Sequence, residues 1–258
     1  MKVTSPSLAL LCALLWQMPA QAAHQANDGV LRLYGPGGPD SALKRAADAF
    51  ARKSNVPVVV TAGPESGWSQ QASQDADLIF AGAEQSMSAF LERYPFLDPQ
   101  SARPYYLRRA VIAVQKGNPS RINGIDDLLR RPLRVVVTEG RGSYNTSGTG
   151  LWEDVAGRLG SLADLQALRR NIVAYEQGSG ASYRAFTRLK ADAWITWVHW
   201  PLNQSDKVDY VEIEPQRRIF RGLSIAQARS ADPITRRFLA FIESPEGETY
   251  FAQDGWTR

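Results

Sequence analysis

The 258 residues of this chain are enough for one large or two small domains, and a hydrophobic content of 44% excludes an intrinsically disordered protein. The 30 basic and 26 acidic side chains are dispersed along the sequence, which argues against a nucleic-acid-binding protein. One cysteine, Cys12, and two histidines, His24 and His199, are too few for a metal site of the Cys and His type. We expect neither a metal nor a cofactor.

Residues 1–22 have the pattern of a secretory signal peptide. Lys2 supplies a positive start, an apolar run follows from Leu8 to Trp16, and residues 20–22 (Ala-Gln-Ala) form a small-x-small cleavage site. We predict cleavage after this site and export to the periplasm. Cys12 leaves with the signal, so the mature chain contains neither a thiol nor a disulfide. Since no later segment approaches about eighteen apolar residues, we also expect a soluble protein without a membrane anchor.

After the signal, strand and helix patterns alternate. Within residues 41–53 apolar side chains recur at helical spacing, which indicates one buried helix face. The pattern predicts strands at 30–34, 56–61 and 77–81 and helices at 41–53, 68–73 and 84–94. Such alternation is typical of parallel strands with helices on both faces of the sheet.

The second half of the sequence continues this alternation. Two apolar β-type runs, at 110–114 and 133–137, flank a turn and a short helix, and a glycine- and serine-rich loop then leads into another helix. The later predicted elements are strands at 171–175 and 192–198, a helix at 182–189 and two closely spaced helices within 234–256.

These patterns predict an α/β fold of two lobes. The sequence contains no internal repeat and no low-complexity linker, so we expect strands rather than a flexible segment to connect the lobes. We assign residues 28–109 together with 216–258 to the first lobe, and residues 110–215 to the second. Each lobe is expected to contain a mixed or parallel sheet flanked by helices.

The sequence GPGGPDS, residues 35–41, lies between a predicted strand and a predicted helix. A helix N-terminus exposes unpaired backbone N–H groups and the positive end of the helix dipole. Glycine allows a ligand to approach the backbone closely, and proline restrains the loop. Gly37 and Gly38, with Asp40 or Ser41 as N-cap, therefore predict a backbone-lined anion site. The alternative is a capped turn without a ligand.

Three further loops have the same character. They are 61–68 (TAGPESGW), 143–154 (SYNTSGTGLWED) and 176–186 (EQGSGASYRAF), and their candidate ligand-binding residues are Ser66, Trp68, Thr146, Ser147, Gly148 and Ser182. Because ligands bind at the carboxyl ends of strands in open α/β sheets, we expect these loops to converge on one small anion. Helix capping is the alternative role of each hydroxyl group. None of the loops has the spacing of a P-loop or a dinucleotide-binding fingerprint.

Arginine and tryptophan residues supply further candidates. Arg221 precedes a strand and either clamps a carboxylate or sulfate in bidentate fashion or lies on the surface. Arg141, in a glycine-rich loop, is a candidate gate residue. Trp197 either packs in the core or, like Trp200, walls the cleft and offers its indole N–H.

The motifs YGPGGPDSALKRAADAF, VTAGP, DADLIFAGAEQSM, GLWED, DAWITWVHWP and FIESPEGETYFAQDGW are distributed over residues 34–256. In these motifs the chain resembles the type II periplasmic solute-binding proteins, and among them the accessory colonization factor AcfC family. The resemblance implies a two-lobed Venus-flytrap fold with a ligand in the cleft, and a relation to sulfate- and molybdate-type oxyanion binders. The chain departs from that family in its longer GRGSYNTSGT loop and in Ala81 and Ala83, where relatives often carry serine.

The loops and the resemblance together predict a solute-binding protein for a small anion, with sulfate as the leading ligand. Carboxylates of the aspartate, citrate or malate type are the alternative, favoured if Arg141 or Arg221 points inward. Closure of the lobes would dehydrate the ligand, and neutral donors and helix ends would replace its water without a full countercharge. An exported hydrolase is disfavoured because no Gly-x-Ser-x-Gly nucleophile elbow is present. The expected partner is an ABC-type permease or a sensor, and the expected state is a monomer.

Overall fold

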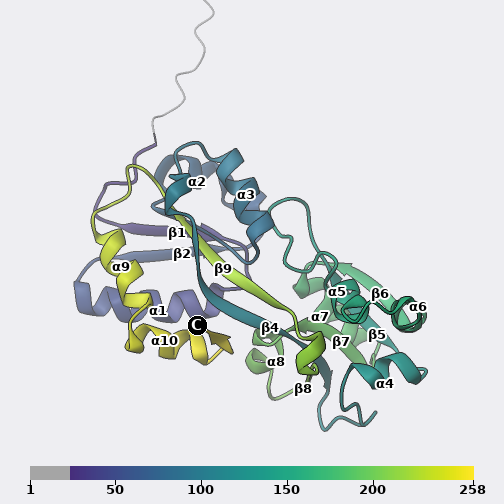
Figure 1. Cartoon of the computed structure of the whole chain (residues 1–258). Helices are drawn as coiled ribbons and strands as arrows, with labels where there is room; N and C mark the ends of the chain where they lie inside the picture. Colours follow the sequence, from purple (N-terminus) through teal and green to yellow (C-terminus); the bar gives the residue numbers. More distant parts are fainter. Residues whose placement is uncertain (1–23) are drawn as a thin grey trace, which may run out of the picture.

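The structure, a computed structural model, describes residues 24–258, so the predicted signal peptide lies outside the described residues. The fold is α/β, as predicted, with a mixed sheet flanked by helices (Figure 1). The N-terminal elements are β1 (Leu31–Gly35), α1 (Asp40–Ser54), β2 (Val58–Ala62), α2 (Ser69–Asp75), β3 (Leu78–Ala81) and α3 (Glu84–Arg93). Their order is that of the predicted alternation.

The rest of the described chain contains further strands and helices, some of which the sequence predicted and some of which it did not. They are β4 (Arg103–Gln115), α4 (Ile125–Arg130), β5 (Val135–Glu139), α5 (Leu151–Gly157), α6 (Leu162–Asn171), β6 (Ile172–Gln177), α7 (Ser179–Arg188), β7 (Ala193–Trp197), α8 (His199–Asn203), β8 (Val208–Glu212), β9 (Phe220–Gln227), α9 (Ile234–Ile242), α10 (Pro245–Ala252) and β10 (Trp256–Thr257). The sequence patterns did not separate α6, α8 or β8 as elements.

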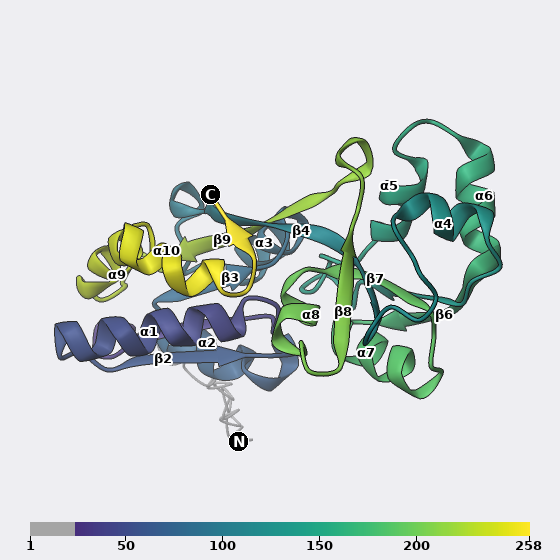
Figure 2. The ribbon, with the colours of Figure 1, turned by 90° about the horizontal axis from the view of Figure 1, so that it is seen from below.

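Strand β4 is shared by two groups of strands. Residues 103–109 pair with β9, whereas residues 110–114 pair with β7 and residues 111–115 with β8, all antiparallel. We call β1, β2, β3, β9 and β10 with their helices the first half of the molecule, and β5 to β8 with theirs the second half. Figure 2 shows the two halves side by side. The apolar run predicted at 110–114 is therefore only the second part of a longer strand, whose first part contains several arginines.

The sheet order explains why the same ends of several strands meet. The order is β2-β1-β3-β9-β4-β7-β5-β6, with β8 and β10 also paired to β4. Strands β1, β2 and β3 are mutually parallel in the first half, and β5, β6 and β7 in the second. The loops that follow parallel strands all leave the sheet at the carboxyl ends of those strands, which form one edge of the sheet. This edge is where the two halves face each other.

Each half has its own hydrophobic core. In the first half, α1 and α9 pack against one face of the sheet through Leu43 and Phe238, while α2 and α3 pack on the other through Ala72 and Phe90 (Figure 1). In the second half, side chains from α4, α5 and α6 join those of β5 and β7 in one buried cluster. Burial of these apolar surfaces provides the main stabilisation of both halves.

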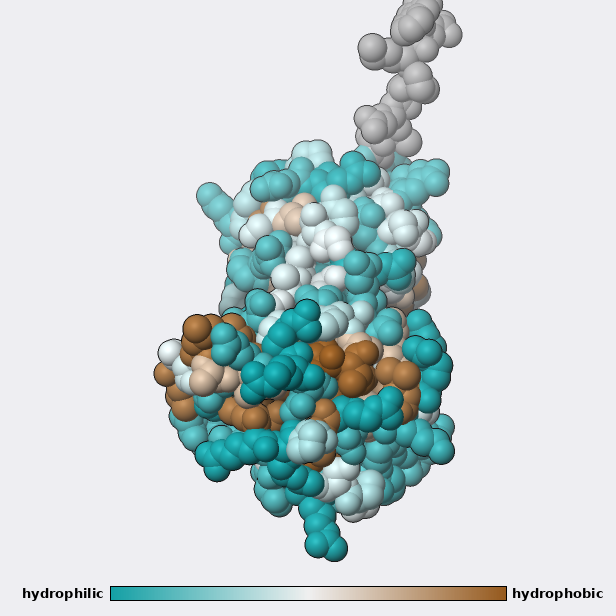
Figure 3. All heavy atoms as spheres, turned by 90° about the vertical axis from the view of Figure 1, so that its right-hand side faces the viewer, coloured by the Kyte–Doolittle hydropathy of each residue, from teal (hydrophilic) through white to brown (hydrophobic). Residues whose placement is uncertain are grey.

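The far end of the second half carries exposed apolar side chains. Leu159, between α5 and α6, and Leu162, the first residue of α6, are 54% and 67% exposed, and Val173 and Tyr175 lie on the edge strand β6. Figure 3 shows hydrophobic surface on this side of the molecule, interrupted by hydrophilic residues. In residues 24–258, no helix combines the length and the apolar character that are required to cross a bilayer.

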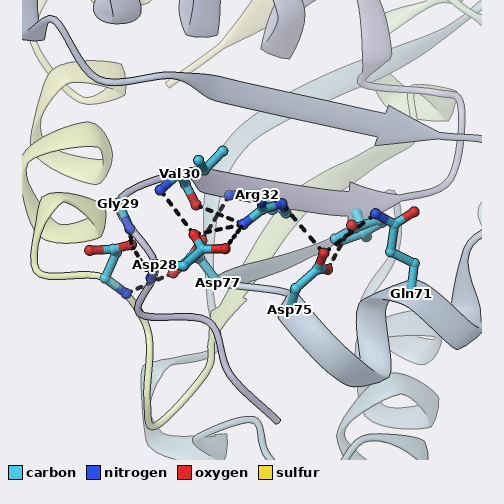
Figure 4. A network of polar contacts seen from close by, with 9 residues as sticks. Asp28, Gly29, Val30, Arg32, Gln71, Asp75 and Asp77 are labelled. Carbon is cyan, nitrogen blue, oxygen red and sulfur yellow. Dashed lines mark hydrogen bonds and ion pairs between the residues drawn. The ribbon is translucent and has the colours of Figure 1, made fainter.

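Asp77, just before β3, joins three segments of the first half. It is fully buried, and its carboxylate accepts hydrogen bonds from the backbone N–H groups of Arg32 (2.8 Å) and Asp232 (2.7 Å). The guanidinium of Arg32 in turn contacts Asp28 at 2.7 Å and Asp75 at 3.4 Å (Figure 4). Burial, with the charges of Asp232 and Asp28, raises the pKa of Asp77 to about 6 against the opposing effect of the two backbone hydrogen bonds.

Replacing Asp77 by asparagine should lower the free energy of unfolding at pH 7 by roughly 1–3 kcal/mol, because the amide offers one accepting oxygen to two backbone donors. In the wild type, the folded-state pKa of Asp77 exceeds its ordinary value of 3.8, so the native state binds more protons than the unfolded state between about pH 4 and pH 6. The ionisation of Asp77 therefore reduces stability as the pH rises through this window, and Asp77→Asn lacks that contribution. Urea unfolding of both proteins from pH 4 to pH 7 measures the difference; an identical pH dependence would contradict it.

Candidate ligand-binding site

A cavity of about 620 Å³ lies between the two halves. Its lining comes from four loops, namely residues 36–38 after β1, 63–66 after β2, 141–147 after β5 and 177–181 after β6. The four glycine- and hydroxyl-rich loops singled out in the sequence thus meet around one space. Two helices, α1 and α7, begin at this cavity, so the positive ends of their dipoles face it.

The central charged group of the cavity is Arg108, on the first part of β4. Its residue is 1% exposed, and its Nη2 donates a hydrogen bond to the carbonyl oxygen of Gly82 at 3.2 Å. The guanidinium carbon lies 4.9 Å from the ring centroid of Trp197 and 5.0 Å from that of Trp256. Its buried Nε has no hydrogen-bond partner, and Arg108 forms no ion pair within the described residues.

Two glycines make room for this guanidinium. A Cβ atom at Gly38 would lie 2.5 Å from Nη1 of Arg108, and a Cβ atom at Gly82 would lie 2.8 Å from Nη2. Any larger residue at either position would displace the arginine head group. Gly38 of the GPGGPD loop, together with Gly82 after β3, therefore leaves the space that the guanidinium occupies.

The environment of Arg108 opposes its positive charge. Burial, and to a smaller extent the charge of Arg221, lowers the pKa of Arg108 to about 9. Burial also holds the pKa of His199 well below its ordinary value, and the charge of Arg108 adds to this shift. A buried cation without a countercharge is costly, and an anion in the cavity would remove that cost.

Further polar groups line the cavity around Arg108. Arg141 and Arg184 are exposed at its edge, and neither forms an ion pair with any residue in 24–258. Glu65 is the carboxylate among the lining residues, and it accepts a hydrogen bond from the hydroxyl of Tyr94 at 2.7 Å. Burial, together with the hydrogen bond to Glu65, raises the pKa of Tyr94. Within residues 24–258, no cluster of three or more His, Cys, Asp or Glu residues has the arrangement of a metal site.

Some of the predicted ligand residues line the cavity and others do not. Those in the lining are Gly37, Gly38, Ser66 and Ser147. Those outside the lining are Ser41, Trp68, Thr146, Gly148, Ser182, Trp197 and Arg221. Arg141, the candidate gate residue, and Trp200 also line the cavity.

The hydroxyl groups outside the lining have protein partners. Thr146 exchanges a hydrogen bond of 2.8 Å with Ser86, and Ser182 accepts one of 2.8 Å from Thr138. Ser41 is not the N-cap of α1, since Pro39 occupies that position and the hydroxyl of Ser41 donates to Asp254. These partners satisfy the hydroxyl groups, which explains why they do not face the cavity.

The other corrections concern packing and charge. Trp68 is buried and donates its indole N–H to the carbonyl oxygen of Gly63 at 3.2 Å, whereas Trp197 is buried beside Arg108. A Cβ atom at Gly148 would lie 2.7 Å from the side chain of Thr138, so this glycine serves close packing.

Arg221 forms an ion pair with Asp154 at 2.5 Å and is not a cavity residue. The arginine that lines the cavity is instead Arg108, which lies opposite Arg221 in the pairing of β4 and β9. Arg108 was not predicted from the sequence because only the apolar part of β4 has the pattern of a buried strand. The available signal was the pair of arginines directly before the buried run AVIAV, of which Arg108 is the first.

A clasp connects the two halves next to the cavity. Ser86, in α3, accepts a hydrogen bond of 2.9 Å from the backbone N–H of Thr146 and shares a second one with its hydroxyl. The ring of Phe90, also in α3, stacks on Tyr144 with the centroids 5.1 Å apart. Because α3 belongs to the first half and residues 144–146 follow β5, these contacts hold the halves together beside the cavity.

Comparison with known proteins assigns the class. The family described as "Bacterial extracellular solute-binding protein" matches residues 31–257. The structure of PEB3 from Campylobacter jejuni is 38% identical in sequence, with a TM-score of 0.82, and the match covers 88% of this chain and 99% of that chain. A structure of L-phospholactate-bound PEB3 aligns with the same identity and coverage and a TM-score of 0.83. No match was found among curated proteins.

A more distant structure shows how widely the fold is shared. The periplasmic molybdate-binding protein of Azotobacter vinelandii is 16% identical, with a TM-score of 0.65, and the match covers 88% of this chain and 99% of that chain. This chain belongs to the family of bacterial extracellular solute-binding proteins.

Replacing Ser86 by alanine should lower the free energy of unfolding by roughly 1–3 kcal/mol, because it leaves the buried N–H and hydroxyl of Thr146 without their partner. Ser73→Ala is the matched control, since the exposed Ser73 hydroxyl contacts only a backbone carbonyl of its own helix, and its effect should stay within about 0.5 kcal/mol. Urea denaturation of both variants measures the two changes. Equal effects would show that the clasp contributes nothing beyond a surface hydroxyl.

Proposed function

We propose that this protein binds a small organic anion, of phosphate or carboxylate type, in the cavity between its halves and delivers it to an ABC-type permease. The observation that carries the proposal is Arg108, a buried guanidinium that lines the cavity without an ion-pair partner in residues 24–258. A bound anion would supply the missing countercharge. The neutral donors expected from the sequence are thus supplemented by a full positive charge.

The size and charge of the cavity favour an organic anion over a single tetrahedral oxyanion. A volume of about 620 Å³ is in the range typical of small-molecule sites. Arg141 and Arg184 provide additional positive charge at the edge for a second anionic group. The PEB3 structure with bound L-phospholactate, a molecule with a phosphate and a carboxylate, supports this choice. Sulfate, the leading ligand from the sequence, is the alternative. The fold that this chain shares with a sulfate-binding protein supports it.

The binding mechanism we propose uses both halves. We assign residues 28–109 with 216–258 and residues 110–215 to two lobes that move as units, since β4 changes its partner strand after Arg109. Closure brings the ligand between Arg108, the N-termini of α1 and α7, and the hydroxyl groups of Ser66 and Ser147. The cavity then replaces the water around the anion by fixed donors.

Further parts of the proposal rest on the sequence. The resemblance to the AcfC family and the predicted signal peptide support a monomeric protein of the periplasm. We propose a binding role without catalysis, and His199 supports it because a fully buried, uncharged imidazole is a poor general base. A role in colonization would follow from the capture of the ligand and not from direct adhesion.

Addition of the ligand should raise the melting temperature, because a ligand that binds only the folded state stabilises it. At a concentration of about 100 times Kd the gain is about 2.7 kcal/mol, or roughly 5–10 °C for a chain of this size. The panel consists of L-phospholactate, phosphate, aspartate, citrate, malate, sulfate and molybdate. Arg108→Met should abolish the rise for every active compound while the ligand-free protein stays folded, since methionine fills the site without a charge. Differential scanning fluorimetry measures both.

The control for this experiment is Arg229→Met, which removes an exposed arginine that lies 3.7 Å from Asp98 and is not part of the cavity lining. It should retain the full ligand-induced shift. A panel without any effect on the wild type, or a shift that survives Arg108→Met, would contradict the proposal.

Ligand affinity should fall as the pH rises above about 9. The pKa of Arg108 in the ligand-free protein is about 9, so at higher pH the free protein must regain a proton before it binds an anion. The dissociation constant should therefore increase about tenfold between pH 8 and pH 10. Isothermal titration calorimetry at pH 7, 8, 9 and 10 measures this, and the proton uptake at pH 9 should appear as a dependence of the enthalpy on the buffer. A constant affinity would show that Arg108 stays charged or does not contact the ligand.

A further inference from the structure

We propose that Glu65 makes the cavity selective for anions that also carry a hydrogen-bond donor, such as a hydroxyl group, an ammonium group or a protonated phosphate oxygen. This inference rests on the proposed function, because it concerns the ligand of the same cavity. Glu65, which carries a negative charge as the ligand does, would then contribute to the specificity of the cavity.

The position of Glu65 is unusual for an anion site. It belongs to the short 3₁₀ helix Glu65–Gly67 after β2, lies in the cavity lining, and its side chain is only 15% exposed. None of the three cavity arginines forms an ion pair with it in the described part of the chain. The carboxylate therefore stands as a separate negative group in a cavity whose other charges are positive.

The contacts of Glu65 leave one of its oxygens available. The hydroxyl of Tyr94 donates to Oε1 at 2.7 Å, and Nε of Arg93 lies 3.9 Å from the same oxygen. Within residues 24–258, Oε2 accepts no hydrogen bond, and it is not among the side-chain oxygens that are buried without a partner. Tyr94 is 1% exposed, so its hydroxyl fixes the orientation of the carboxylate from the protein interior.

A carboxylate in this position favours ligands that carry a hydrogen-bond donor. An ionised carboxylate only accepts hydrogen bonds, so it repels an unprotonated ligand oxygen and forms a charge-assisted bond with an O–H or N–H group. Sulfate carries no proton at neutral pH, whereas every inorganic phosphate ion carries one or two. Arg108 would thus bind the anionic group, while Glu65 accepts a hydrogen bond from an O–H or N–H group of the ligand.

A purely structural role of Glu65 makes a different prediction. If Glu65 served only as the acceptor for Tyr94, glutamine would replace it without consequence, because its side-chain carbonyl oxygen also accepts that hydrogen bond. The variant Glu65→Gln therefore retains the contact with Tyr94 and removes the negative charge. Any change in ligand preference is then assigned to the charge.

The test uses a matched pair of ligands, L-phospholactate and 2-phospho-L-glycerate, which differ by one hydroxyl group. Calorimetric titration of the wild type should show that the hydroxyl-bearing compound binds about 10- to 100-fold more tightly. Phosphate should likewise bind more tightly than sulfate. In Glu65→Gln both preferences should shrink to about threefold or less. Glu84→Gln is the control, since Glu84 bonds to Ser224 outside the lining, and it should retain the wild-type preferences.

The possible outcomes separate the two proposals. If the wild type binds both compounds equally well, or if Glu65→Gln keeps the preference, the role of Glu65 is refuted while the anion-binding function stands. If neither the pair nor the two inorganic anions bind to the wild type, the proposed function fails, and the selectivity proposal fails with it. If Glu65→Gln does not fold, equal binding of the two compounds by the wild type still refutes the role of Glu65.

Discussion

A positive charge that has no countercharge within the described protein is the constraint on which the site depends. Arg108 is buried beside two indole rings, and two glycines keep the space that its head group needs. A carboxylate in place of the rings would neutralise the guanidinium permanently. The rings of Trp197 and Trp256 stabilise the cation through their π faces but leave its charge available to a ligand. The sequence left core packing and a cleft wall open for Trp197, which in the structure packs against the guanidinium of Arg108 together with Trp256.

The placement of Arg108 on β4 couples binding to the arrangement of the halves. The partner strand of β4 changes between Arg109 and Ala110, directly after this residue. Loops from both halves line the same cavity, so a ligand bound at Arg108 as we propose would contact both halves at once. Its binding energy would then favour the joined arrangement over any open one. The clasp of Ser86 and Thr146 acts in the same direction without a ligand, which lowers the cost of closure.

The sequence predicted the alternation of elements and the four loops, because both depend on local patterns. It did not predict which polar side chains face the cavity. Thr146 and Ser182 look like ligand donors in the sequence, but Ser86 and Thr138, which lie 60 and 44 residues earlier, satisfy their hydroxyl groups. Arg108 was missed because inward or outward direction in a strand depends on register, and register is set by pairing with distant strands.

The cavity separates its cationic and its accepting groups, and this separation has a physical reason. If Glu65 paired with Arg108, each would satisfy the other and the cavity would attract no anion. Tyr94 and Arg93 instead contact Oε1 of Glu65, and within residues 24–258 Oε2 accepts no hydrogen bond. The cavity can therefore respond to two properties of a ligand, its negative charge and its ability to donate a proton to a hydrogen bond. A site of neutral donors alone responds only to the first, which is why the carboxylate adds discrimination that the loops and helix ends cannot provide.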